Sequence, residues 1–156
     1  MDEIVVRGMA KWPGVPDVYG WLALDRRGNW LIKGARIGNP ALREFIGRNY
    51  QPDARGRWYF QNGPQRVFVK LAYTPLVARL EGEALVDHCG RPLGEPRGLW
   101  LDDEGSVLVL GNAGLAVLDD RDLARFAERL DEGAEALPCV AKAGVSRQFG
   151  FVQDPA

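Results

Sequence analysis

One short motif occurs three times in this chain and limits its fold more than any other feature. Asp25–Trp30, Asp53–Trp58 and Asp102–Val107 share the pattern Asp-x-x-Gly-x-apolar. The aspartate accepts hydrogen bonds from nearby backbone N–H groups, and the glycine supplies the positive φ that closes the turn. Apolar runs flank the first and third copies on both sides, as in a β-hairpin. The motif therefore predicts repeated hairpins and indicates no particular chemistry.

The length and composition are those of an ordinary globular protein. With 156 residues, 46% of them hydrophobic and 26% charged, the chain suits one domain or two small halves that share a core. Cys89 and Cys139 belong to no C-x-x-C pair, and no segment resembles a signal peptide or a membrane span. We therefore expect a cytoplasmic protein with reduced thiols that does not associate with membranes.

Local patterns predict two principal helices. Asn39-Pro40 is typical of a helix start, with Asn as N-cap and Pro in the first turn, and predicts a helix over 40–48. Asp119-Asp120 similarly predicts a helix over 120–132, ended by Gly133. Strands are expected over Glu3–Arg7, Trp21–Leu24, Trp30–Lys33, Arg57–Gln61, Arg66–Ala72, Leu99–Leu101, Val107–Leu110, Leu115–Leu118 and Gln148–Gln153. Val77–Cys89 is expected to be extended, with an interruption at Gly82.

The two halves of the sequence are similar to each other. Leu24–Gly34 parallels Leu101–Gly111, and the Leu-x-x-Phe-x-x-Arg pattern of 42–48 recurs at 123–129. Either match alone is compatible with chance, but two matches in the same order favour an internal repeat. We predict an α+β fold of two hairpin-helix-hairpin (ββαββ-like) units, mainly antiparallel. A basic unit would cover 1–79 and an acidic unit 80–156, within one compact globule.

The net charge of −1 hides an uneven distribution of charged residues. Up to Arg79 the chain has 13 Lys and Arg against 6 Asp and Glu; from Leu80 onward it has 7 against 15. A basic half suits an anionic ligand, whereas halves or subunits of opposite charge also attract each other. We favour the second interpretation, because the basic residues are scattered along the sequence.

Residues 20–80 resemble small proteobacterial families of unknown function that contain repeated strand–strand–helix motifs. The resemblance lies in Gly20-Trp21, Gly28-Asn29-Trp30, Arg36-Ile37 and Gly56–Gly63, and it fades in the second half. These motifs carry no agreed catalytic residue. The resemblance implies an α+β protein of repeated motifs with a regulatory or ligand-binding role.

The residues typical of catalysis are scarce. His88 is the only histidine, and no serine lies in a G-x-S-x-G context, which argues against a serine hydrolase. If 77–89 is a strand, Asp87 and Cys89 share one face and His88 takes the other, so the three side chains could not act together. We therefore expect a structural role for this cluster and no catalytic residue.

Cofactor and metal motifs are equally weak. Gly111–Gly114 follows an apolar run, as a nucleotide loop would, but it precedes a predicted strand and so favours a hairpin. Asp102–Glu104 and Asp119-Asp120 could attract a divalent cation, although turn and capping roles account for their carboxylates. We expect no cofactor and no metal.

The aromatic and basic residues of the first half are the strongest binding candidates. Strand alternation would bury Trp58 and Phe60 and place Tyr59 and Phe68 on other faces, so the second hairpin is apolar on both sides. Its second face packs against the other half, the interpretation we favour, or forms a homodimer seam or a ligand site. The candidate ligand-binding residues are Trp12, Tyr19, Arg36, Trp58, Asn62 and Arg66.

The sequence thus predicts a non-enzymatic module that binds a ligand or a protein and has a regulatory role. The expected partner is an anionic small molecule or a protein. The alternative is an enzyme of undetermined class with a cleft between the two units. A third hypothesis, a binder of single-stranded nucleic acid, conflicts with the acidic second half and the isoelectric point near 5.9.

Overall fold

The chain forms two compact units, each with its own sheet. The computed structural model describes residues 1–12, 14–130 and 137–156. The first unit contains residues 1–25, 29–72 and 150–156, and the second contains 26–28 and 73–149. The main division thus falls between Ala72 and Tyr73, and the tip of the first hairpin belongs to the second unit. Within the described residues, no helix has the length and apolar character needed to cross a membrane.

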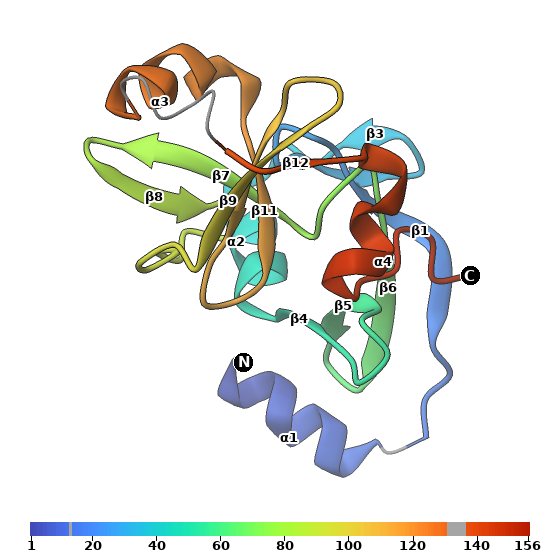
Figure 1. Cartoon of the computed structure of the whole chain (residues 1–156). Helices are drawn as coiled ribbons and strands as arrows, with labels where there is room; N and C mark the ends of the chain where they lie inside the picture. The colour runs from blue at the N-terminus through green and yellow to red at the C-terminus, as the bar shows by residue number, and fades with distance from the viewer. Residues whose placement is uncertain (13, 131–136) are drawn as a thin grey trace. The chain divides into compact units, whose positions relative to one another are not determined.

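The sheet of the first unit has the strand order β3-β2-β1-β6-β5-β4. Neighbouring strands are antiparallel except for the central pair, in which β1 and β6 run parallel side by side (Figure 1). Helix α2 connects β3 to β4, and α1 precedes the sheet. The bounds are α1 Glu3–Lys11, β1 Val18–Leu24, β2 Trp30–Ile32, β3 Ala35–Arg36, α2 Pro40–Arg48, β4 Tyr50–Pro52, β5 Trp58–Asn62 and β6 Gln65–Leu71.

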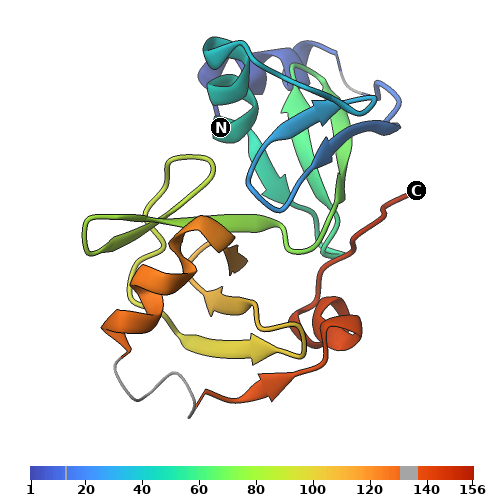
Figure 2. The ribbon, with the colours of Figure 1, turned by 90° about the horizontal axis from the view of Figure 1, so that it is seen from above.

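The sheet of the second unit has the order β12-β9-β10-β11-β7-β8. Its β11 and β7 run parallel, and β12 lies parallel to β9 at one edge (Figure 2). The bounds are β7 Leu76–Glu81, β8 Ala84–Asp87, β9 Gly98–Asp102, β10 Val107–Leu110, β11 Leu115–Leu118, the 3-10 turn η1 Asp120–Asp122, α3 Leu123–Arg129, β12 Cys139–Val140, the 3-10 turn η3 Lys142–Gly144 and α4 Val145–Phe149.

The prediction of an α+β fold with two repeated sheet units is confirmed, but the topology gives the repeat a different register. In each unit the first strand of one antiparallel group pairs in parallel with the last strand of the next group: β1 with β6, and β7 with β11. This correspondence matches the turn at Asp102 with the turn at Asp53, not with the turn at Asp25. Helix α2 lies between the two groups of its unit, whereas α3 follows both groups, so these helices are not equivalent.

The aspartate–glycine turn occurs a fourth time, at Asp87–Arg91. In all four turns the aspartate N–H donates to the carbonyl four residues on, and its Oδ1 accepts from the N–H of that same residue. The four glycines have φ values of +79° to +84° and are Gly28, Gly56, Gly90 and Gly105. The extended segment expected over Val77–Cys89 is interrupted at Gly82, as predicted, but it ends at Asp87, with His88 and Cys89 in the next turn.

The prediction of a strand over Glu3–Arg7 is wrong, because this segment is the first half of α1. Val5 is the one buried side chain of α1. One buried residue can anchor a short helix, whereas a strand with one buried face would bury every second side chain. The backbone N–H of Asp2 donates to Oδ1 of Asn49 at 2.7 Å, and Arg48 pairs with the Asp2 carboxylate at 3.1 Å. These contacts with the end of α2 hold the start of α1 in place.

The prediction of a strand over Gln148–Gln153 is also wrong. Helix α4 continues to Phe149, Gly150 then adopts a φ of +72°, and Val152 forms only an isolated bridge with Arg57. The helix at 40–48 is confirmed, with Asn39 Oδ1 accepting from Leu42 N–H. The helix expected over 120–132 consists of η1 and α3 as far as Arg129, and its predicted end at 131–133 lies outside the described residues.

Both faces of the second hairpin are covered within the first unit. On one face Trp58 packs against Tyr50, with ring centroids 4.9 Å apart, and Phe60 packs against Phe45 at 5.7 Å. On the other face Phe68 is only 1% exposed, because the ring of Tyr19 stacks on it at 5.0 Å. The hairpin thus has an aromatic layer on each side.

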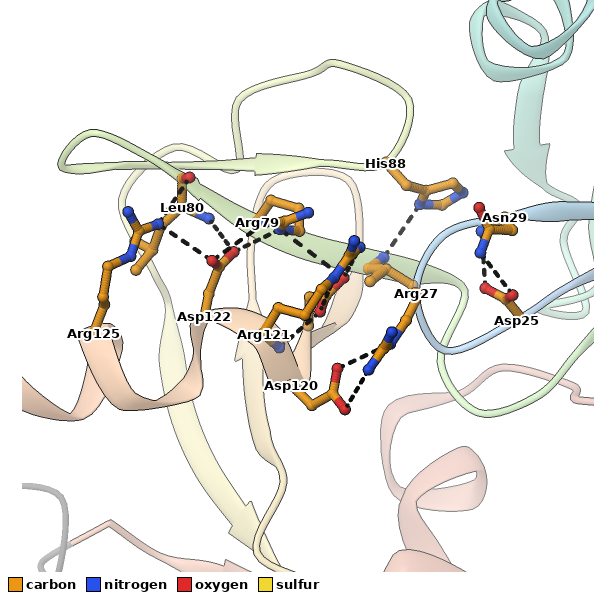
Figure 3. Close-up of polar contacts among 12 residues, drawn as sticks. Asp25, Arg27, Asn29, Arg79, Leu80, His88, Asp120, Arg121, Asp122 and Arg125 are labelled. Carbon is orange, nitrogen blue, oxygen red and sulfur yellow. Dashed lines mark hydrogen bonds and ion pairs between the residues drawn. The ribbon is translucent and has the colours of Figure 1, made fainter. Parts of the chain in front are cut away.

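A network of ion pairs ties η1 and α3 to β7 in the second unit (Figure 3). The carboxylate of Asp122 accepts from Arg79 Nε at 2.6 Å, from Arg125 at 3.2 Å and from the backbone N–H of Leu80 at 3.0 Å. Asp119 is fully buried and accepts from Arg121 at 2.6 Å. Burial opposes ionisation of Asp119, but the hydrogen bonds from Arg121 outweigh it and lower its pKa to about 2.

We expect the second unit to lose stability in acid, as the pH falls from about 4 towards about 2. The pKa of Asp119 lies below its ordinary value of 3.8, and that of Asp122 is also lowered, chiefly by Arg79. A depressed pKa stabilises the fold above the unfolded-state value, and the gain is lost as the pH falls through the folded-state value. Urea unfolding across this range should show the loss, and Asp119→Asn should make it smaller. An unchanged pH profile in Asp119→Asn would contradict this assignment.

Candidate functional site

A cavity of about 380 Å3 opens in the first unit where α1 ends beside the β5–β6 hairpin. We call it the Gln61 cavity. Gly8 of α1 faces the hairpin turn, where a Cβ would make ordinary van der Waals contact with Gly63 and Pro64 at 3.4–3.5 Å. The cavity is lined by Met9, Trp12, Gly14, Val15, Asp17, Tyr59, Gln61, Pro64 and Arg66.

Gln61 is the polar residue buried in the wall of this cavity, with 1% of its surface exposed. Its side-chain Nε2 donates to the carbonyl oxygen of Gly63 at 2.9 Å, which fixes the orientation of the amide. Oε1 has no hydrogen-bond partner among the described residues. A buried amide oxygen without a partner costs about 1–3 kcal/mol, so such atoms are rare unless a ligand or water satisfies them.

Two aromatic residues, Trp12 and Tyr59, line the cavity. Trp12 follows the last turn of α1 and is 57% exposed, with Lys11 Nζ 5.7 Å from its ring centre. Tyr59 lies on β5, and its hydroxyl accepts from Gln51 Nε2 at 3.0 Å, which restrains the ring. A half-exposed indole and a restrained phenol offer stacking surface to a flat ligand.

The charged groups of the cavity are paired with each other. Arg66 donates to both carboxylate oxygens of Asp17, with both distances 3.1 Å. The guanidinium carbon of Arg66 also lies 5.6 Å from the ring centre of Tyr59. Arg66 therefore lines the cavity with its side chain held between Asp17 and the ring of Tyr59, and Asp17 balances most of its charge.

The structure brings two of the six predicted ligand-binding residues, Trp12 and Arg66, to this cavity. Trp58 lies in the core with 4% exposure, and Tyr19 stacks on Phe68. Asn62 and Arg36 are exposed, on the hairpin end and on β3, and neither lines the cavity. Gln61 is not among the six predicted residues; a polar residue at a buried position of a strand is the signal that could have identified it.

The Asp87-His88-Cys89 cluster has the geometry of a structural turn. The backbone N–H of Val77 donates to His88 Nδ1 at 3.2 Å, so the proton of the neutral imidazole is on Nε2, which lies 3.7 Å from Cys89 Sγ. This tautomer cannot accept the thiol proton at Nε2. Burial raises the pKa of the Cys89 thiol to about 12, which disfavours the nucleophilic thiolate.

Across residues 1–12, 14–130 and 137–156, no group of three or more His, Cys, Asp or Glu side chains is placed to hold a metal ion. Instead, the carboxylate of Asp102 accepts from its own turn and from the Tyr73 hydroxyl at 2.7 Å.

Comparisons with known proteins identify a family and a fold. The profile of a family described as "Protein of unknown function (DUF2946)" matches residues 1–156. A solved structure of a DUF1285 family protein from Silicibacter pomeroyi DSS-3 is similar, with 20% identity and a TM-score of 0.57, covering 77% of this chain and 74% of that one. Another, from Shewanella baltica OS155, has 12% identity and a TM-score of 0.55, covering 72% and 94%. At these identities the likeness concerns the fold alone. No curated protein matches the chain.

Proposed function

The chain belongs to this family of proteins of unknown function, and we propose that it is a non-enzymatic ligand-binding module. The proposed site is the Gln61 cavity of the first unit. The observation that carries the proposal is the amide oxygen of Gln61, buried in the cavity wall without a hydrogen-bond partner among the described residues. A ligand with a donor at this atom would supply the hydrogen bond that the described residues do not.

The chemistry of the ligand follows from the groups that would contact it. Oε1 of Gln61 is an acceptor, so the ligand must present an N–H or O–H donor. Trp12 and Tyr59 favour a flat group that stacks on an aromatic ring, and Met9, Val15 and Pro64 supply apolar contact. We therefore propose a planar heterocycle with an exocyclic or ring N–H donor.

The arrangement of charges supports binding rather than acid–base catalysis. Asp17 and Arg66 form a bidentate pair, so each is already hydrogen-bonded to the other. A general acid or base must reach the reacting proton directly or through one water. The pair instead fixes one side of the cavity.

We expect Gln61→Met to abolish most of the affinity for a planar donor ligand. Methionine keeps the approximate size of the side chain and removes the acceptor together with the Nε2 donor to Gly63, and a lost hydrogen bond to the ligand in a buried site weakens binding roughly tenfold. Binding is measured as quenching of tryptophan fluorescence by adenosine, guanosine, cytidine, uridine and nicotinamide, and a Trp12→Phe variant identifies the share of the signal that comes from Trp12 among the five tryptophans. For adenosine, N6,N6-dimethyladenosine is the matched ligand without the donor.

Gln153→Met is the matched protein control. Gln153 also donates to a backbone carbonyl in this unit, that of Ala72, but it does not line the cavity. This variant should bind like the original protein. Equal binding of adenosine and its dimethyl derivative, or unchanged affinity in Gln61→Met, would contradict the assignment. The absence of quenching by the whole panel would overturn the proposal of a planar ligand.

A further inference from the structure

A second cavity, also of about 380 Å3, opens in the second unit beside the turn between β9 and β10. We call it the Arg26 cavity. It is lined by Arg26, Arg27, Glu104, Gly105, Ser106, Val107, Leu118, Asp120 and Leu123. Arg26 and Arg27 come from the tip of the first hairpin, which belongs to this unit. The cavity thus contains basic residues that the sequence assigned to the first half.

Among the described residues, Arg26 is the cation of this cavity with the weakest acidic partner. Asp120 accepts from Nε and Nη2 of Arg27, both at 3.1 Å (Figure 3). Glu104 Oε2 accepts from Lys142 Nζ at 2.8 Å, and the same oxygen lies 4.0 Å from Arg26 Nη1, the outer limit of an ion pair. Each acid of the cavity wall is therefore hydrogen-bonded to another cation, and among the described residues Arg26 has the long ion pair with Glu104 but no hydrogen-bonded carboxylate.

The Arg26 side chain is held in place before any ligand arrives. Its guanidinium carbon lies 4.9 Å from the ring centre of Tyr73, and its Nη2 donates to Ser106 Oγ at 2.7 Å. The Tyr73 hydroxyl in turn donates to the buried Asp102 at 2.7 Å, which fixes the ring. An oriented guanidinium loses little conformational entropy when it binds an anion.

Ser106 adds a second donor next to Arg26. Its oxygen accepts from the guanidinium, so its own O–H proton must point elsewhere. An anion close to both groups would accept from Arg26 and from the Ser106 hydroxyl together. Phosphate oxygens suit this pair, because a planar guanidinium and a hydroxyl can bond to different oxygens of the same tetrahedral group.

We propose that the Arg26 cavity binds the phosphate group of a small phosphorylated metabolite. A phosphate ion alone is much smaller than a cavity of about 380 Å3, which leaves room for the rest of a metabolite against Val107, Leu118 and Leu123. This site is independent of the Gln61 cavity, and it places the anionic partner expected from the sequence in the second unit.

Titration calorimetry in phosphate-free buffer tests this site. The probes are inorganic phosphate, glycerol 3-phosphate and, as a carboxylate of similar charge, succinate. We expect glycerol 3-phosphate to bind more tightly than inorganic phosphate, and succinate more weakly than both. We expect Arg26→Gln to weaken phosphate binding at least about tenfold, because hydrogen bonds between charged groups are the strong ones. Ser106→Ala, which keeps the arginine, should weaken it about three- to tenfold.

Arg129→Gln is the control for a general loss of positive charge. Arg129 belongs to α3 of the same unit, lies over Phe126 and does not line the cavity. An equal loss in Arg129→Gln and Arg26→Gln would overturn the proposal, as would full affinity in Arg26→Gln or preferential binding of succinate. In the unmodified protein, phosphate should also shift the Arg26 Nε resonance in NMR spectra. An unmoved Arg26 signal at saturating phosphate would equally refute the site.

Discussion

Gly56→Ala is expected to destabilise the first unit by about 2–5 kcal/mol, through two costs that add. Gly56 has a φ of +79°, a conformation that costs an L-residue about 1–2 kcal/mol. A Cβ at this position would also overlap the carbonyl oxygen of Gly150, which belongs to the backbone and cannot turn away. The chain is held this close because Val152 N–H donates to Gly56 O at 2.9 Å. The variant must therefore strain the turn or release the C-terminal segment.

Gly105→Ala separates these two costs. Gly105 occupies the same position of an equivalent turn with a φ of +83°, but a Cβ there meets nothing within 4 Å. This variant should lose only the conformational part, about 1–2 kcal/mol. Amide hydrogen exchange measured by NMR gives the opening free energy of each unit separately. Equal losses for the two alanine variants would show that the Gly150 contact has no energetic weight.

The second large effect is expected for Asp122→Ala, which should destabilise the second unit by about 2–4 kcal/mol. The substitution leaves the buried N–H of Leu80 without its acceptor, and a buried unsatisfied donor costs about 1–3 kcal/mol. It also separates Arg79 and Arg125 from the carboxylate that ties α3 to β7. The two arginines are partly exposed and can turn to water, so most of the loss comes from the backbone donor.

Asp120→Ala is the matched control for Asp122→Ala. The two aspartates lie in the same turn, but the side chain of Asp120 is 68% exposed and pairs with the exposed Arg27. A solvent-exposed ion pair of this kind contributes about 0–1 kcal/mol. Urea denaturation of both variants should show this contrast. A similar midpoint for both would mean that the buried network does not stabilise the unit.

Much of the fold follows from local sequence because its turns are specified by single residues. An aspartate that accepts two backbone N–H groups and a glycine with positive φ define a turn almost without regard to the rest of the chain. The same is true of the Asn39 cap of α2. The turn at Asp87 was not predicted, because Pro92 occupies the position where the other copies of the motif have an apolar strand residue. Its hydrogen bonds are those of the other copies.

The terminal segments show where local sequence is insufficient. The run Ile4-Val5-Val6 has the β-branched residues typical of a strand, yet it is helical because Asn49 and Arg48 fix its first turn. Isolated helices of this length are marginal in water, so the decision lies in packing against the rest of the unit. Packing against the rest of the unit also decides the structure of the C-terminal segment, where Val152 forms a single bridge with Arg57 in place of the expected strand.

The candidate sites depended on tertiary structure almost entirely. Trp12 and Arg66 were recognisable from their residue types, but Gln61 becomes notable only when burial removes water from an amide oxygen that nothing else satisfies. Likewise, nothing in the sequence distinguishes Arg26 from the other arginines of the first half. It becomes a candidate anion site because long-range contacts place Glu104 with Lys142 and Asp120 with Arg27.

The sequence by itself determined the repeated hairpins, the α+β class and the position of α2, since each depends on neighbours within a few residues. Only the tertiary structure decided the parallel pairs β1–β6 and β7–β11, and with them the register of the repeat. It also decided that a Cβ has no room at two of the aspartate–glycine turns, at Gly56 against Gly150 and at Gly28 against His88. The physical reason is the same throughout: a turn is a local balance of hydrogen bonds and φ, whereas strand pairing, burial and charge compensation join residues far apart in the chain.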